Sequence, residues 1–155
     1  MKLRFAKPLD KKNYLKVQLE AFPNLQAKKQ SKYFDIKVKN KEIFVVKIDN
    51  KYTGHLCFGH HLLDPPFAPS IFLEELAVKK EFRGRGIATE LKKYMEFYCK
   101  KKNIPMIYLA TGDYKRNKAV KLYKKLGYKQ IGKLSEINPK SEYKYGQVFY
   151  GKVVR

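Results

Sequence analysis

Two adjacent acidic residues, Glu74 and Glu75, lie inside a hydrophobic segment, residues 71–78, that is typical of a strand. The chain has only 14 Asp and Glu residues, so this pair stands out. A carboxylate can take a proton from an alkyl ammonium group and release a nucleophilic amine. Because side chains alternate along a strand, we expect the two acids on opposite faces, with Glu74 on the face of Leu76 and Val78 unless a bulge intervenes. A purely structural interpretation stays open, in which both are solvated charges of an edge strand.

A glycine-rich turn, Gly84-Arg85-Gly86, follows this strand and precedes a helical pattern. The N–H groups that begin a helix lack acceptors and favour an anion such as pyrophosphate. Position 89 is Thr, so the Gly-x-Gly-x-x-Gly fingerprint of dinucleotide sites fails, and no Gly-Lys-Ser/Thr loop occurs. Taken alone, the turn is explained as well by a tight bend that needs two glycines.

The elements that position these groups can be predicted from apolar spacing. Helices are expected over residues 9–22 (opened by Asp10), after Pro23, from the glycine turn to the Lys100–102 run, and over 117–126. The third has its apolar residues on one face: Ile87, Leu91, Tyr94, Met95, Tyr98 and Cys99. Strands are expected at 3–6, 42–48, 52–58, 71–78, 106–110, 128–134 and 147–154. The order β-α-α-β-β-β-α-β-α-β-β predicts an α/β (α+β) domain with a mixed sheet.

Two motifs carry a resemblance to a known family. Arg83-x-x-Gly86-x-Ala88 resembles the Arg/Gln-x-x-Gly-x-Gly/Ala signature of the GNAT superfamily of acyl-CoA N-acyltransferases, and Asn117-x-Ala119-x-x-Leu122-Tyr123-x-x-Leu126-Gly127-Tyr128 resembles its downstream motif. The resemblance covers residues 71–128. It implies a single domain over residues 1–155, with a mostly antiparallel central sheet of about six to seven strands flanked by about four helices.

The resemblance also implies a cofactor and site residues. Acetyl-CoA is the expected acyl donor, with coenzyme A as product. The phenol of Tyr123, with an ordinary pKa of about 10, suits a donor that protonates the departing thiolate, although its spacing also fits a core aromatic. The backbone of Leu76, Ala77 and Val78 is expected to pair with the pantetheine arm, and the Asn117 side chain is expected to hydrogen-bond that arm. The pyrophosphate is expected to bind to Gly84, Arg85, Gly86, Ile87, Ala88 and Thr89.

The implied activity is N-acetylation of a primary amine, on a small molecule or on a protein Lys or N-terminus, by direct attack in a ternary complex. The strand around Glu74 looks like that of GNAT polyamine and aminoglycoside acetyltransferases, so Glu74 is preferred to Glu75 as the base. Enzymes that acetylate protein N-termini often carry Glu where this chain has Gly112, which disfavours that subclass unless the neighbouring Asp113 substitutes for the Glu. A catalytically silent acyl-CoA sensor stays an alternative. Homodimers are common in the family, so a second copy is a candidate partner.

The charge raises a further alternative, a nucleic-acid-binding module. The chain has 35 Lys and Arg against 14 Asp and Glu, a formal net charge of +21. Only 5 of these cations are Arg, and they are not interleaved with aromatic residues, which argues against nucleic acid as a specific ligand. Most of the charge is expected to be solvated Lys surface. A strongly cationic acceptor would be repelled by it unless the pocket is locally acidic.

Cysteine usage and hydropathy suggest a compartment. Only Cys57 and Cys99 occur, there is no signal-peptide pattern, and no apolar run approaches a membrane span, so a cytoplasmic protein without membrane attachment is expected. His55, Cys57, His60 and His61 lack a second ligand cluster, so no metal site is expected. Instead His60, His61 and the loop at 62–69 are expected to border the acceptor pocket, where a histidine could be an auxiliary base.

Overall fold

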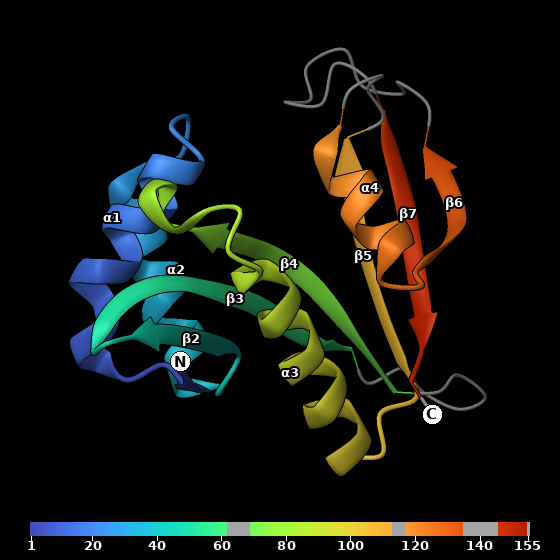
Figure 1. Cartoon of the computed structure of the whole chain (residues 1–155), viewed down its shortest axis with the longest axis horizontal. Coiled ribbons are helices and arrows are strands. Elements are labelled where there is room, and N and C mark those ends of the chain that lie inside the picture. The colour runs from blue at the N-terminus through green and yellow to red at the C-terminus, as the bar shows by residue number, and fades with distance from the viewer. Residues whose placement is uncertain (62–68, 113–116, 135–145, 155) are drawn as a thin grey trace. The chain divides into compact units, whose positions relative to one another are not determined.

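The computed structural model describes residues 1–61, 69–112, 117–134 and 146–154 (Figure 1). Its α-helices are α1 (Lys11–Ala21), α2 (Ala27–Lys39), α3 (Ile87–Lys101) and α4 (Lys118–Lys125), with short 3₁₀ turns at Pro8–Asp10 and Lys80–Phe82. Its strands are β1 (Lys2–Phe5), β2 (Ile43–Ile48), β3 (Lys51–His61), β4 (Ser70–Val78), β5 (Met106–Gly112), β6 (Lys129–Leu134) and β7 (Gln147–Val153). The predicted order of helices and strands is confirmed.

The seven strands form one sheet in the order β1-β2-β3-β4-β5-β7-β6. Among the pairings with a described register, β4–β5 is parallel and the others are antiparallel. The β4–β5 ladder joins Ser70–Leu73 to Met106–Leu109. The predicted fold class, a mixed and mostly antiparallel sheet with four flanking α-helices, is therefore confirmed within the described residues.

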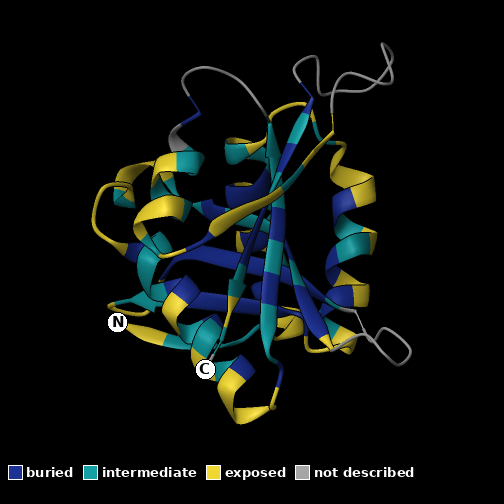
Figure 2. Cartoon of the chain, turned by 90° about the vertical axis from the view of Figure 1, so that its right-hand side faces the viewer, coloured by how far each residue is buried: buried dark blue, intermediate teal, exposed yellow. Residues whose placement is uncertain are grey.

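The chain divides into two compact units. The first comprises Met1–Gly59 and Glu74–Tyr98, and the second His60–Leu73 and Cys99–Arg155. In the first unit, α1 and α2 cover one face of β2–β4, where their Tyr14 and Phe34 pack with Val45, Cys57 and Ala77 of the strands. In Figure 2 these strands are largely buried, whereas the helices carry exposed residues on their outer sides.

Helix α3 covers the opposite face of the same strands. The rings of Phe44 and Phe58 lie 4.8 Å and 5.7 Å from Tyr94 and Tyr98 of α3, respectively, between ring centroids. The apolar face predicted for α3 is thus buried or half-buried as expected. Its N-terminal end, which follows the glycine turn, is held by this packing.

In the second unit, α4 packs on the strands β5, β7 and β6 (Figure 1). The Tyr123 ring of α4 lies 6.0 Å from the rings of both Tyr128 and Tyr150. Lys152 of β7 donates a hydrogen bond of 2.8 Å to the carbonyl of Leu126 at the end of α4. These contacts hold the C-terminal half of the downstream sequence motif.

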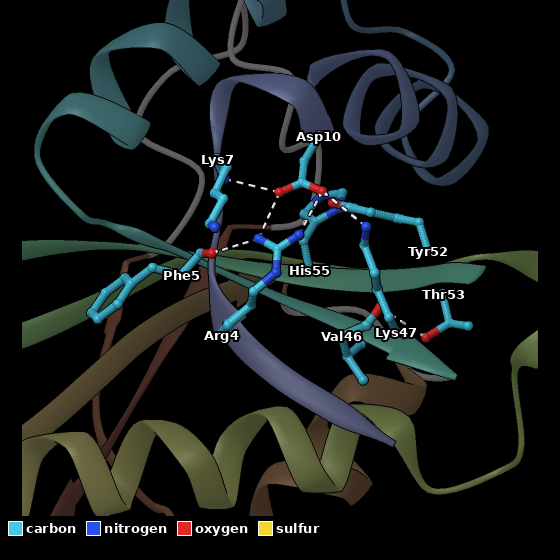
Figure 3. A network of polar contacts seen from close by, with 9 residues as sticks. All are labelled: Arg4, Phe5, Lys7, Asp10, Val46, Lys47, Tyr52, Thr53 and His55. Atoms are coloured by element: carbon cyan, nitrogen blue, oxygen red, sulfur yellow. Dashed lines mark hydrogen bonds and ion pairs between the residues drawn. The ribbon is translucent and has the colours of Figure 1, made fainter. Parts of the chain in front are cut away.

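Asp10 forms a buried clamp at the start of α1 (Figure 3). Its carboxylate accepts two hydrogen bonds from Arg4, of 2.7 Å and 2.9 Å, one from the backbone N–H of Lys7, and lies 3.4 Å from Lys47 Nζ. As expected, Asp10 is the residue at which α1 opens, but its side chain makes no capping bond to that helix. It instead ties β1 and β2 to the turn before the helix, since a fully buried carboxylate is stable only when cations and donors surround it.

We predict that Asp10→Asn lowers the free energy of unfolding by about 3 kcal/mol at neutral pH, because Arg4 and Lys47 lose their buried counter-charge. Burial alone would raise the pKa of Asp10, but Arg4, the Lys7 N–H and Lys47 outweigh it and the pKa lies below its usual value. The ionised form is therefore the stabilising one, and the deficit of the variant shrinks as the pH falls through the pKa of folded Asp10. Urea denaturation at a series of pH values measures the difference in the free energy of unfolding.

Asp35→Asn is the matched control, because Asp35 makes an ion pair of 2.6 Å with Lys11 while remaining exposed. Its loss is expected to change the free energy of unfolding by less than about 0.5 kcal/mol. Equal effects of the two substitutions at neutral pH would contradict the clamp.

Candidate functional site

Glu74 and Glu75 of β4 both reach the helix pair α1 and α2. Glu74 accepts hydrogen bonds from Tyr33 and Lys37 of α2, and Glu75 accepts one from Gln18 of α1. The expectation that alternation separates them onto opposite faces is therefore wrong. The described β4–β5 ladder ends at Leu73, immediately before the pair, and alternation is a property of regular strands.

Glu74 is matched by a buried cation. Lys37 Nζ lies 2.8 Å from Glu74 Oε1 and 3.0 Å from Glu42 Oε2, and it donates to the carbonyl of Phe58 at 2.8 Å. Burial alone would lower the pKa of Lys37, but the bonds to Glu74 and Glu42 outweigh it and the net shift is upward. Lys37 is therefore charged at neutral pH, and its single positive charge is shared between the ion pairs with Glu74 and Glu42.

Glu75 has different surroundings, although it is the next residue. Within the described residues it takes part in no salt bridge, and its donor is the neutral amide of Gln18, with Nε2 2.6 Å from Oε2. Burial raises the pKa of Glu75 to about 7; the Gln18 bond acts against this rise and the charge of Glu74 adds to it. Near neutral pH this carboxyl group can both accept and release a proton.

The turn before α3 has an open backbone. Gly84 and Gly86 have φ angles of +79° and +78°, and a Cβ placed on either would meet no atom within 4 Å. Glycine is thus required here by conformation rather than by space. The bond from Glu90 N to Gly86 O, of 3.1 Å, is the first of the helix, and the N–H groups before it have no acceptor inside α3. A phosphate group fits such a turn.

Two arginines frame this turn. Arg83 donates from Nε to the carbonyl of Val78 at 2.9 Å, which ties the turn to the end of β4. The guanidinium of Arg85 lies 5.2 Å from the centre of the Phe82 ring. Both arginines are exposed and add positive charge beside the helix start.

The backbone of Leu76, Ala77 and Val78 lies beyond the β4–β5 ladder, which ends at Leu73. On the other side, β3 approaches closely, since a Cβ at Gly54 would come within 2.7 Å of the Ala77 carbonyl oxygen. Gly54 was not singled out from the sequence. The close approach of β3 to the C-terminal end of β4 depends on the absence of a side chain at Gly54.

Asn117 and Tyr123 belong to the second unit. Asn117 caps α4, where its Oδ1 accepts from Ala119 N at 3.0 Å, and its Nδ2 donates to Thr111 Oγ1 at 2.9 Å and to the carbonyl of Gly112 at 2.7 Å. Both N–H groups of its amide are thus used within the chain, and its role toward a cofactor stays a prediction. Tyr123 is half-buried, and burial raises its pKa to about 12, so its hydroxyl is protonated at neutral pH.

Four polar residues of this region were missed by the sequence analysis: Gln18, Gln30, Tyr33 and Lys37. They lie on α1 and α2, where the apolar periodicity is weak. One signal was available, because Gln18 follows Tyr14 by four residues and so shares the buried stripe of α1. A polar residue on such a stripe calls for a partner across the interface.

Among the described side chains, no group of three or more His, Cys, Asp or Glu could hold a metal ion. Cys57 and Cys99 are free and buried. The His61 side chain, Asp113 and residues 62–68 of the expected acceptor loop lie outside the described residues. Among helices that are described, none is long and apolar enough to cross a membrane.

Comparison with known proteins finds a family and a fold. The model of the acetyltransferase (GNAT) family matches residues 11–128. An N-acetyltransferase from Staphylococcus aureus Mu50 is similar in structure, with 23% identity, a TM-score of 0.82 and coverage of 99% of this chain and 98% of that one. An aminoglycoside 6'-N-acetyltransferase complexed with coenzyme A has 17% identity, a TM-score of 0.83 and coverage of 100% and 98%.

A ribosomal-protein-alanine N-acetyltransferase from Brucella melitensis has the same fold, with 15% identity, a TM-score of 0.80 and coverage of 99% of both chains. At these identities the solved structures show the fold alone. A search of curated protein sequences finds no significant match.

Proposed function

The chain belongs to the GNAT family of acetyltransferases and is an enzyme of that class, and from this premise we propose that it transfers the acetyl group of acetyl-CoA to a primary amine by direct attack in a ternary complex. The amine belongs to a small molecule or to a protein Lys or N-terminus. The whole of residues 1–155 is proposed to form this one domain. The cytoplasmic setting inferred from cysteine usage stays a prediction, and so does a homodimer.

The observation that carries this proposal is the contrast between Glu75 and Glu74. An alkyl amine is mostly protonated at neutral pH, because its pKa is about 10. A base that ionises near the working pH removes that proton most effectively, and the pKa of Glu75 is raised to about 7 by burial. The charge of Glu74 is matched by Lys37. We therefore assign the base to Glu75, in place of the sequence-based preference for Glu74.

Acetyl-CoA supplies an acetyl group activated as a thioester. The open glycine turn and the first N–H groups of α3 support a pyrophosphate site formed by Gly84, Arg85, Gly86, Ile87, Ala88 and Thr89. The backbone of Leu76, Ala77 and Val78, beyond the β4–β5 ladder, is proposed to bind the extended arm, with Asn117. Tyr123 is proposed to donate a proton to the leaving thiolate, because its hydroxyl stays protonated at neutral pH.

We predict that Gly86→Ala weakens acetyl-CoA binding by about tenfold or more in calorimetric titration, because an L-residue at a φ of +78° costs about 1 to 2 kcal/mol and displaces the turn. Gly127→Ala is the control: Gly127, after α4, has a φ of +80° and space for a Cβ. It should cost similar stability and leave binding unchanged. Equal binding losses in the two variants, or no binding by the unaltered protein, would argue against this cofactor site.

The function itself is tested by thiol release from acetyl-CoA over a panel of amines: polyamines, aminoglycosides, amino acids and Lys-bearing peptides. In the unaltered protein kcat/KM is expected to rise with pH through about 7, as Glu75 loses its proton. Glu75→Gln should remove this limb and lower kcat/KM by about 100-fold. Glu74→Gln is the matched comparison and should keep the limb. The reverse result would assign the base to Glu74, and cofactor binding without transfer to any amine would indicate a sensor.

For Tyr123→Phe we expect kcat to fall by about 10- to 100-fold, with acetyl-CoA affinity within twofold of the unaltered protein. The hydroxyl is lost but the ring contacts with Tyr128 and Tyr150 remain. Single-turnover kinetics and calorimetry measure the two quantities separately. Unchanged kcat would show that Tyr123 is a packing residue.

A further inference from the structure

Gln18 is a fully buried polar residue of α1 that bridges β3 and β4. Its Oε1 lies 2.8 Å from His55 Nε2 on β3, and its Nε2 lies 2.6 Å from Glu75 Oε2 on β4. The same Nε2 is 3.4 Å from Gln30 Oε1 on α2. An amide with partners at both its oxygen and its nitrogen cannot turn over without losing them, so the orientation of Gln18 is fixed.

The partners set the direction of each hydrogen bond. An ionised Glu75 can only accept, so Gln18 presents its N–H to Glu75 and its oxygen to His55. His55 then carries its proton on Nε2 and accepts at Nδ1 from the Tyr52 hydroxyl, 2.9 Å away. Burial lowers the pKa of His55 to about 3, so the ring stays neutral and this tautomer persists at neutral pH.

We propose that Gln18 is a positioning residue for Glu75, and that His55 and Tyr52 act through it by fixing the orientation of its amide. Gln18 favours the ionised carboxylate through a hydrogen bond, and because an amide is neutral it leaves the charge available to take a proton. A cation in its place would have tied up the charge, as Lys37 does for Glu74. The proposal rests on the proposed function, in which Glu75 is the base.

Apart from burial, which favours the protonated form, the Gln18 hydrogen bond is the largest influence on the pKa of Glu75. Tyr14 of α1, Tyr33 of α2 and Cys57 of β3 stay protonated at neutral pH, because burial raises the pKa of each. Glu74 and Lys37 are charged, but they form a pair 2.8 Å apart and act on Glu75 in opposite directions.

Two contacts near the start of α1 keep Gln18 in place. Before its first residue, the Asp10 clamp ties the chain to β1 and β2, and Figure 3 includes Tyr52 and His55 in the view of this clamp. Later in the helix, Tyr14 donates to Gln30 of α2 at 2.9 Å. Gln18 is thus held over β4 by contacts that do not involve Glu75.

Gln18→Met tests the proposal, because it keeps the length and volume of the side chain and removes the donor. The titration midpoint of Glu75, followed by carbon-13 NMR of its carboxyl group, should rise by about one pH unit, and the acidic limb of kcat/KM should move with it. Gln18→Asn stays polar but shortens the side chain by one methylene, so it should also raise the Glu75 midpoint and the acidic limb of kcat/KM. His55→Leu should also raise the Glu75 midpoint and the acidic limb. His55→Gln keeps an N–H near the position of Nε2, so both quantities should stay at their values in the unaltered protein.

Asp35→Asn is the control, since it removes an ion pair between the same two helices, of 2.6 Å between Lys11 and Asp35, that does not involve Gln18 or Glu75. It should leave the Glu75 midpoint unchanged. An unchanged midpoint in folded Gln18→Met and Gln18→Asn, or an equal rise in Asp35→Asn, would overturn the proposal. If the midpoint rises in the Gln18 variants while the unaltered protein acetylates no amine, the positioning of Glu75 is supported and the proposed function fails.

Discussion

The site depends on a carboxyl group, Glu75, that is half-buried beside a neutral donor rather than a cation. Burial of an unpaired carboxylate is costly, and a protein commonly avoids it by pairing the charge or by keeping the proton. Here the first solution is used for Glu74, which pairs with Lys37, and the second is partly used for Glu75, whose pKa burial raises to about 7. Two adjacent residues of one strand therefore have different partners, a cation for Glu74 and a neutral amide for Glu75.

This contrast explains why α1 and α2 contain buried polar side chains. Helix α1 supplies Gln18 to Glu75, and α2 supplies Tyr33 and Lys37 to Glu74. Neither helix is strongly amphipathic in sequence, because part of each inner face serves β4 rather than the apolar core. Helix α3, by contrast, packs on aromatic residues of the sheet and leaves its N-terminal turn open for an anion.

The sequence was sufficient for the fold and for the glycine turn, because both depend on local signals. The apolar period of α3 and the motif from Asn117 to Tyr128 can each be recognised within a short stretch of sequence. The partners of Glu75 could not be predicted in this way, since Gln18 and Glu75 are 57 positions apart and Gln18 and His55 are 37 apart. The preference for Glu74 relied on the resemblance to polyamine and aminoglycoside acetyltransferases. The expected separation of the two acids relied on strand alternation, which fails where the ladder to β5 ends. The net charge of +21 suggested an anionic macromolecule, but the residues that carry specific chemistry point to a phosphate-bearing cofactor.

The central claim is that Glu75 changes protonation state near neutral pH. Its most direct test is the carbon-13 NMR titration of the Glu75 carboxyl group in the unaltered protein, because this requires neither the acceptor amine nor acetyl-CoA. We expect a midpoint at about 7. A midpoint in the ordinary glutamate range, about 4.3, would contradict it, because such a group is too weak a base to accept the proton of an amine efficiently at neutral pH.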